Sequence, residues 1–307
     1  MNLQQLRYII KITECGSFNR ASELLYVSQP ALTKAVRELE TEMGIQIFHR
    51  GAHGVSLTAD GTEFIAYARG VCLQCDVINE RYGQGGAVKK KFGVSTQHYS
   101  FATKAFVETV KDFDMNEYDF AIRETKTREV IEDVSQMKSE IGVLYMSDFN
   151  RTVISKILKN NRLAFSKLID CRAYVYLWKH HPLAGREKIT FAELENYPCL
   201  SFEQGDENSF YFSEEILSAF DYPQMIHTND RATMLNLMVG VNGYTLCSGI
   251  ICEELNGSDY VAVPFEEDEN HPSPVMEIGY VVKEDTVLSA MGKRYVEELR
   301  KYLNANI

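Results

Sequence analysis

The sequence predicts a multidomain protein in which a small α+β module and one long helix precede a larger α/β domain. Three observations predict this organisation. Residues 1–57 contain three segments with helical apolar spacing, followed by two short apolar runs around a glycine-bearing tip. From about Thr58 to Tyr82 the chain contains no proline and keeps a narrow apolar stripe. Beyond residue 89, short apolar runs alternate with helical segments, as in parallel sheets.

The length and composition are typical of a soluble, folded protein. Its 307 residues suit two or three domains, and the apolar fraction of 45% and charged fraction of 24% are ordinary. No apolar run approaches the ~18 residues of a membrane helix, and residues 1–6 lack the features of a secretory signal. We therefore expect a cytoplasmic protein that does not contact a membrane. The seven scattered cysteines favour reduced thiols over a disulfide framework.

The net charge of −11 is unevenly distributed along the chain. Residues 1–91 hold 11 Lys and Arg against 9 Asp and Glu, a net charge of +2, whereas the rest holds 21 against 34, a net charge of −13. A mildly basic module on an acidic body is compatible with binding DNA, although net charge alone says little about function.

Capping signals separate three helices in the N-terminal module. Gly16 ends the first, and Ser17 is a good N-cap for a second helix at about Asn19–Leu25. Ser28 caps the third, and Pro30 lies in its first turn, where the missing N–H costs little.

The third helix carries two different stripes at ~100° per residue. The apolar stripe, which is expected to pack inward, contains Leu32, Val36, Leu39 and Met43. The polar stripe, which is expected to face solvent, contains Gln29, Pro30, Thr33, Lys34 and Arg37. Gln, Arg and Lys can bond base edges or phosphates, and the Thr methyl can meet a thymine methyl. These are the requirements for a recognition helix in the major groove.

Two short β-type runs, residues 45–50 and 55–58, flank the tip at residues 51–54. They predict a small hairpin, or wing. Arg50 and His53 flank its tip and are expected to contact phosphate or the minor groove.

Residues 1–65 resemble the winged helix-turn-helix of LysR-type transcription regulators. The matching positions are Gly16-Ser17-Phe18, Ala21-Ser22, Leu24, Val27 to Thr33, Val36, Leu39-Glu40, Gly44, Phe48-His49-Arg50, Val55, Leu57-Thr58 and Gly61. The resemblance implies a helix-turn-helix from Phe18 to Arg37. It implies DNA contacts by Gln29, Pro30, Thr33, Lys34 and Arg37. With the cap residue Ser28 and the wing residues Arg50 and His53, these are the expected DNA-binding residues. The family usually has Arg where this chain has His53, so a wing contact there would be weaker and pH-dependent.

The long helix carries a heptad stripe that calls for a partner helix. Its positions are spaced 4, 3, 4, 3, 4 and comprise Phe64, Ala68, Val71, Cys75, Ile78 and Tyr82. The resemblance implies the family's dimerising linker helix. Two-fold symmetry then predicts a quasi-palindromic double-stranded DNA site and a homodimer or homotetramer. A flexible joint follows at residues 83–86.

Cys72 and Cys75 form a Cys-x-x-Cys pair on this helix. One interpretation is a redox or metal switch, and the other is two small apolar side chains in a helix stripe. The pair lacks the strand-to-helix context of a thioredoxin-like site and a second pair for zinc, which favours the packing interpretation.

The C-terminal part alternates predicted strands and helices. Strands are expected near residues 92–94, 119–123, 141–146, 172–177, 199–202, 225–227, 244–247, 260–263 and 276–282. Helices are expected at about 100–111, 127–138, 208–219, 231–239 and 288–303. The order resembles the two-lobed, periplasmic-binding-protein-like effector domain of the same family. The expected divisions are 1–58 for the DNA-binding module, 59–88 for linker helix and hinge, and 89–307 for the effector domain. Within it, lobe I takes about 89–165 and 269–307, and lobe II about 166–268.

Ligands of such sheets bind beyond the carboxyl ends of the strands, here between the lobes. Ser95, Thr96, Gln97 and His98 lie between the first strand and a helix N-terminus, where hydroxyls and free N–H groups favour an anion. Ser201 and Phe202 are expected to face them, with Thr125 and Cys247 as further candidates. The alternative is that Ser95 and Thr96 only cap the helix.

The sequence therefore predicts a DNA-binding transcription regulator controlled by a small molecule, with an anion as one candidate class. RNA polymerase is a further partner if the protein activates. The chain shows no phosphate-binding glycine loop, nucleophile elbow or catalytic Cys–His signature, and His180-His181 has no third metal ligand nearby. We expect neither catalysis nor a cofactor. The alternatives are a thiol-based redox sensor and a solute-binding or enzymatic domain that carries a DNA-binding module.

Overall fold

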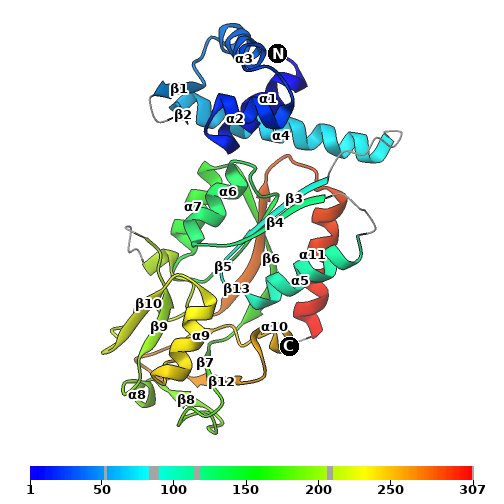
Figure 1. The fold of residues 1–307 in the computed structure, drawn as a ribbon. Helices are drawn as coiled ribbons and strands as arrows, with labels where there is room; N and C mark the ends of the chain where they lie inside the picture. The colour runs from blue at the N-terminus through cyan, green and yellow to red at the C-terminus, as the bar shows by residue number, and fades with distance from the viewer. Residues whose placement is uncertain (52–53, 83–89, 114–117, 206–209, 306–307) are drawn as a thin grey trace. The chain divides into compact units, whose positions relative to one another are not determined.

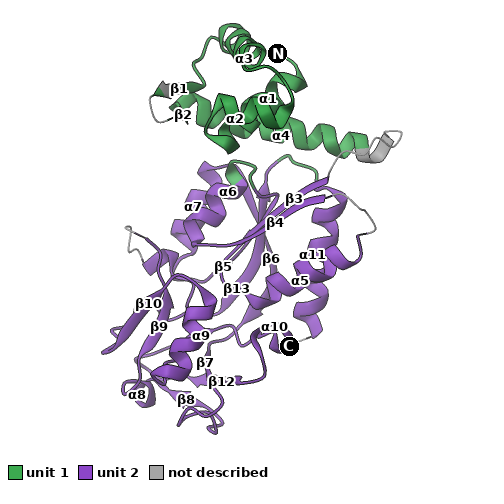
Figure 2. Ribbon diagram, in the orientation of Figure 1, with its two compact units in different colours: residues 1–88, 135–138, 285–287 green, residues 89–134, 139–284, 288–307 purple. Residues whose placement is uncertain are grey.

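The computed structural model describes residues 1–51, 54–82, 90–113, 118–205 and 210–305. The chain divides into two compact units, coloured separately in Figure 2. Unit 1 contains residues 1–88 with 135–138 and 285–287, and unit 2 contains the remainder. We describe each unit by itself.

Unit 1 is a three-helix module with a two-stranded hairpin and a long helix (Figure 1). Its elements are α1 (Leu3–Cys15), α2 (Phe18–Leu25), α3 (Gln29–Met43), β1 (Phe48–Gly51), β2 (Gly54–Leu57) and α4 (Ala59–Tyr82). The predicted caps are confirmed. Gly16 closes α1 at φ +60°, and the Ser17 and Ser28 hydroxyls accept backbone N–H bonds at the starts of α2 and α3.

The core of unit 1 lies between α1, α3, the hairpin and the first half of α4. Leu32, Val36 and Leu39 are fully buried there, as their spacing predicts, and Met43 is half-buried at the end of the stripe. At Gly61 the chain passes so close to Ile47 that an added Cβ would meet the backbone carbonyl of that residue. This close approach holds the start of α4 against the hairpin.

Lobe I of unit 2 is a five-stranded sheet in the order β4-β3-β5-β13-β6. The strands are β3 (Lys90–Thr96), β4 (Tyr118–Glu124), β5 (Ile141–Met146), β6 (Leu163–Cys171) and β13 (Met276–Lys283). β3, β4 and β5 are parallel, and β13 runs antiparallel to β5 and β6. The late strand thus returns to the first lobe, as predicted.

Helices cover both faces of this sheet (Figure 1). The helices are α5 (Ser100–Lys111), α6 (Thr127–Ser135), α7 (Arg151–Asn160) and α11 (Ala290–Ala305). Alternate side chains of β5 separate the two cores. Ile141 and Val143 pack with α5 and α11, and Leu144 packs with α6 and α7.

Lobe II is built differently, because its main sheet, β11-β7-β12-β8, is largely antiparallel. A parallel pair, β9 and β10, lies beside it. The elements are β7 (Tyr174–Trp178), β8 (Ile189–Thr190), α8 (Phe191–Leu194), β9 (Cys199–Phe202), η1 (Phe210–Phe212), β10 (Met225–Thr228), α9 (Arg231–Gly240), β11 (Thr245–Cys247), α10 (Glu253–Asn256) and β12 (Tyr260–Glu266).

Two expectations for unit 2 are wrong. The helix expected at 208–219 is only the short turn η1 within the described residues, because Glu214 and Glu215 are buried and bond to other segments. The lobe boundary expected between 165 and 166 falls inside β6, so the chain leaves the first sheet only after Cys171. None of the described helices is long and apolar enough to cross a membrane.

Candidate DNA interface and effector cleft

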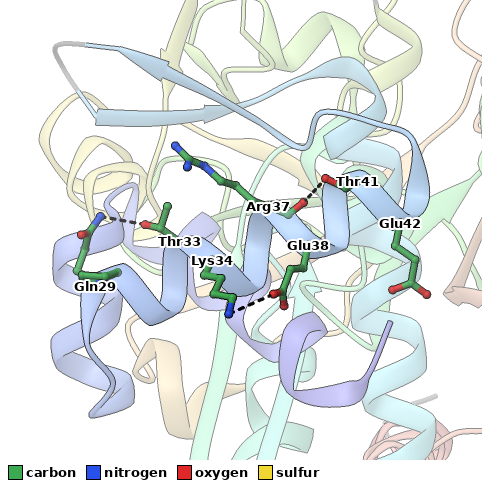
Figure 3. Close-up of a pocket in the computed structure, with 8 residues that line it drawn as sticks. Gln29, Thr33, Lys34, Arg37, Glu38, Thr41 and Glu42 are labelled. Carbon is green, nitrogen blue, oxygen red and sulfur yellow. Dashed lines mark hydrogen bonds and ion pairs between the residues drawn. The ribbon is translucent and has the colours of Figure 1, made fainter.

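The polar stripe of α3 forms a shallow, open groove on unit 1 (Figure 3). All five positions expected on the exposed face line it: Gln29, Pro30, Thr33, Lys34 and Arg37. Pro30, Lys34 and Arg37 are exposed, whereas Gln29 and Thr33 are half-buried. The helix therefore presents a polar surface with its apolar stripe turned to the core.

Short contacts hold part of this surface in place. Gln29 Nε2 donates to Thr33 Oγ1 at 3.0 Å, and Lys34 Nζ lies 3.8 Å from Glu38 Oε1. Within the described parts of the chain, Arg37 has no side-chain partner, and Figure 3 shows its guanidinium extending away from Lys34 and Glu38. Arg37 is thus the side chain of the groove that is most available to a ligand.

Three residues of the groove were not predicted from the sequence, namely Glu38, Thr41 and Glu42. They lie one helical turn beyond Lys34, Arg37 and Glu38, so the 3.6-residue repeat was a signal that could have found them. Glu38 and Glu42 make the C-terminal half of the groove acidic. Phosphate would be attracted to Lys34 and Arg37, which precede these carboxylates along α3, and to the start of the helix, where the dipole is positive.

The wing is present, with Arg50 paired with Val55 across the antiparallel strands. His53 and the side chain of Arg50 lie outside the described residues. Ser28 is used as the α3 cap, with its Oγ 3.3 Å from the Ala31 nitrogen.

The residues of the predicted heptad stripe on α4 are divided between the core of unit 1 and the solvent-exposed surface. Ala68 is 2% exposed and packs into the core of its own module together with Ile65 and Cys72. Val71 and Ile78 are 44% and 57% exposed. Phe64 and Cys75 are half-buried, and the side chain of Tyr82 lies outside the described residues. An apolar stripe remains on α4 for a partner, although Ala68 is not part of it.

The side chains at the end of β3 and just after it are buried, and those of Ser95 and Gln97 bond to other residues of lobe I. Ser95 Oγ donates to Asp133 Oδ2 at 2.6 Å and lies 2.8 Å from Ser139 Oγ. The Gln97 amide donates to Thr127 Oγ1 at 2.5 Å and accepts from the Tyr145 nitrogen at 3.0 Å. Ser95, Thr96 and Gln97 are all 0% exposed. The side chains of Ser95 and Gln97 thus hold lobe I together, while the Thr96 hydroxyl has no hydrogen-bond partner among the described residues. None of the three caps α5, whose N-cap residue is Tyr99.

His98 is the member of this group that reaches the other lobe. Its ring stacks on Phe202 with centroids 3.8 Å apart, so the two predicted residues do meet. The Glu214 carboxylate accepts from the His98 backbone nitrogen at 2.8 Å and lies 2.9 Å from its Nδ1. A carboxylate of the chain itself therefore occupies the place expected for an anionic ligand.

Further contacts join the two lobes around this point. Arg231 at the start of α9 pairs with Glu124 at the end of β4, and the Thr127 nitrogen donates to Gln204 Oε1 at 3.1 Å. The other predicted residues are peripheral. Ser201 Oγ lies 2.8 Å from His227 Nδ1, and Thr125 bonds to Glu129.

A cavity of about 70 Å³ lies beside these contacts, within unit 2. Of the predicted residues, His98, Phe202 and Cys247 line it. Glu214, Glu215, Arg231 and Thr245 also line it and were not predicted. Burial, and then the charge of Glu214, raise the pKa of Glu215 to about 8.

Four of the cysteines have thiol pKa values that are raised and not lowered. Burial raises the pKa of Cys72, and that of Cys247 is raised to about 12. Burial also raises the pKa values of Cys171 and Cys199. Redox-sensing cysteines have lowered pKa values, so these four have the opposite character.

Comparison with known proteins identifies the family. Residues 3–62 match the family model described as "Bacterial regulatory helix-turn-helix protein, lysR family", and residues 100–304 match "LysR substrate binding domain". A relative from Escherichia coli (strain K12), the uncharacterized HTH-type transcriptional regulator YnfL, is 27% identical over 66% of this chain and 66% of its own length.

Solved structures share the fold. Full-length OxyR from Pseudomonas aeruginosa covers 99% of this chain and 95% of its own with a TM-score of 0.66 at 20% identity. Full-length CbnR, solved with its target DNA, covers 98% of this chain and 100% of its own with a TM-score of 0.56 at 16% identity. The family models cover both units, and the chain therefore belongs to the LysR family, as a DNA-binding transcription regulator with an N-terminal helix-turn-helix and an effector-binding domain.

Proposed function

We propose that the polar face of α3 binds in the major groove of double-stranded DNA and recognises the base sequence of the operator. Arg37 would bond a guanine edge or a phosphate, and Lys34 would neutralise a phosphate. The single observation that carries this assignment is the exposed guanidinium of Arg37, which has no side-chain partner among the described residues and lies beside a buried apolar stripe. Gln29 and Thr33, already bonded to each other, would present one fixed pair of polar atoms to a base.

The test compares Arg37→Ala with Arg300→Ala in the full-length chain. Both remove one arginine charge, but Arg300 is exposed on α11 in unit 2. On DNA selected from a random pool, Arg37→Ala should weaken binding by about 1–3 kcal/mol, about five- to 150-fold, with little change in melting temperature. Equal binding by the two variants, or a collapse of stability in Arg37→Ala, would contradict the assignment.

The second part of the proposal is that a small molecule in the unit 2 cavity controls DNA binding. Its support is a cavity whose lining residues come from both lobes and carry the His98–Glu214 and Arg231–Glu124 contacts. A ligand that prefers one arrangement of the lobes would shift the population toward it. The experiment is a thermal-shift screen of the full-length chain, followed by DNA binding with and without each hit.

A homodimer formed through the exposed stripe of α4 would place two α3 groove surfaces on one quasi-palindromic site. The exposure of Tyr67, Val71 and Ile78 supports this, since apolar side chains at heptad spacing gain by burial in a second helix. Ile78→Glu should convert the dimer to a monomer in sedimentation. Asn79→Asp also adds a negative charge at an exposed position of α4, but it lies about 100° around the helix from Ile78 and should leave the dimer intact.

The proposal also covers where the protein acts, whether it is an enzyme and whether it senses redox state. The protein would act in the cytoplasm on chromosomal DNA and would not turn its ligand over. The redox alternative is disfavoured by the raised thiol pKa values. A variant with Cys72→Ser and Cys75→Ser should keep its response to the effector.

A further inference from the structure

The cavity in unit 2 also constrains the chemistry of its ligand. We infer that the effector is a small organic cation, a protonated amine on a short aliphatic body, bound by Glu215 and Thr245. This inference rests on the proposed function, because it assigns a ligand class to the same cavity. It replaces the anion that the sequence suggested.

Two polar atoms in the cavity wall lack partners. Glu215 is 5% exposed, and its Oε1 accepts from the Phe202 nitrogen at 2.8 Å. Its Oε2 has no hydrogen-bond partner among the described residues, and the same holds for the hydroxyl of Thr245, also 5% exposed. A buried acceptor without a donor costs roughly 1–3 kcal/mol. An ammonium group has three donors and no acceptor, so it would satisfy the carboxylate and the hydroxyl oxygen together.

The charges around the cavity favour a cation. Arg231 pairs with Glu124, and His98 lies against Glu214. Across the ranges that the structure describes, Glu215 is the cavity carboxyl without a basic partner. An anionic ligand would place a second negative charge beside the Glu214 carboxylate in a poorly solvated space, which is unfavourable.

The protonation of Glu215 links binding to pH. Because burial and Glu214 raise its pKa to about 8, Glu215 is largely neutral in the empty cavity at pH 7. A bound ammonium favours the carboxylate, so binding releases a proton below pH 8. The titratable groups that act on Glu215 or line its cavity are Glu214, Tyr99, Tyr145, Tyr176, Cys199, Tyr222, Cys247, His98 and Arg231.

The remaining wall and the volume define the body of the ligand. The apolar side chains that line the cavity are Met234, Leu235, Leu246, Ile250, Ile251 and Met276. A volume of about 70 Å³ is little more than the ≈30 Å³ share of each of two water molecules. This space suits an amine with a short alkyl chain, and larger ligands would require the lobes to separate.

The test uses the full-length chain with ethylamine, and with acetate and ethanol as probes of similar size and different charge. Calorimetry and thermal shift should detect binding of the amine and neither of the others. The amine's dissociation constant should fall close to tenfold from pH 6 to pH 7 and level off above about pH 8.

Substitutions test whether Glu215 and Thr245 bind the amine. Glu215→Gln keeps the shape and removes the charge, so it should weaken amine binding at least tenfold and remove the pH dependence. Glu203→Gln changes an exposed carboxyl in the same stretch of chain and should leave binding unchanged. Thr245→Val, which removes the hydroxyl at constant volume, provides a second test if Glu215→Gln does not fold.

The outcomes separate the ligand class from the function. Binding of acetate that is retained in Glu215→Gln and lost in Thr245→Val would overturn the amine and leave the effector cavity standing. Amine binding that ignores both substitutions would overturn this site. If the amine binds as expected and operator affinity is the same with and without it, the ligand class stands and control of DNA binding through this cavity fails.

Discussion

The α3 groove and the unit 2 cavity are opposite kinds of surface. In the groove the key side chains are exposed, and Arg37 has no side-chain partner within the described residues. In the cavity nearly every polar group is buried and already bonded, with Glu215 Oε2 and Thr245 Oγ1 as exceptions in the described wall. A surface for a large polyanion can offer free charge to water. A cavity for a small molecule must satisfy its polar groups in the empty state or leave them to the ligand.

The largest expected effect comes from a substitution that damages unit 1 alone. Gly61→Ala should destabilise unit 1 by about 1–3 kcal/mol, because the new Cβ would meet the Ile47 carbonyl. Gly70→Ala, in the same helix with open space around it, should instead stabilise by about 0.5–1 kcal/mol. Urea unfolding followed by operator binding measures both. If ligand binding to unit 2 were lost with Gly61→Ala, the two sites would not be separable in this way.

The second prediction concerns the cavity in the absence of ligand. The folded pKa of Glu215 is raised from the ordinary 4.5 to about 8, so the folded state binds more protons between these pH values. Stability should therefore fall as pH rises from about 4.5 to 8. Glu215→Gln should remove this part of the slope in melting curves recorded across the range. Parallel slopes in the two proteins would show that Glu215 is not buried in its neutral form.

The third prediction, with a smaller effect on stability, concerns the residue that caps α3. Ser28→Ala removes the hydroxyl that caps α3 and should cost about 1 kcal/mol of unfolding free energy. Ser28→Asn retains a capping side chain and should restore most of it. If Ser28→Ala weakened operator binding far more than it lowered stability, Ser28 would also contact DNA directly.

The smallest effect on stability should come from Lys34→Ala. Its pair with Glu38 spans 3.8 Å between two exposed side chains, so stability should change by less than about 1 kcal/mol. If Lys34 neutralises one phosphate, the slope of log affinity against log salt should decrease by ~0.9. Titrations at several salt concentrations decide this, and an unchanged slope would remove Lys34 from the interface.

The exposed face of α3 could be predicted because it is determined by residues that lie close together in the sequence. Ser28, Pro30 and the repeat of Leu32, Val36 and Leu39 determine where α3 starts and which face is buried, so the other face follows.

The cavity was not predictable in the same way. His98 meets a carboxylate 116 positions further along the chain, and no periodicity reports such a pair. Glu214 and Glu215 lie in a segment whose composition suits an exposed helix, and only long-range bonds show that it is buried. Two of the residues expected from the strand ends, His98 and Phe202, line the cavity. The pattern could not separate them from Ser95 and Gln97, whose polar atoms are used inside lobe I.

The bonds made by Glu214 and Glu215 have a kinetic consequence. The backbone N–H groups of His98 and Phe202 donate to these two carboxylates and not to a neighbouring strand or helix. Their exchange with deuterium from solvent therefore requires only that the carboxylates move away, while the amides inside β3 and β5 exchange on deeper opening. Deuterium uptake at these two positions thus reports how often the cleft opens in the intact protein, before any ligand or operator is known.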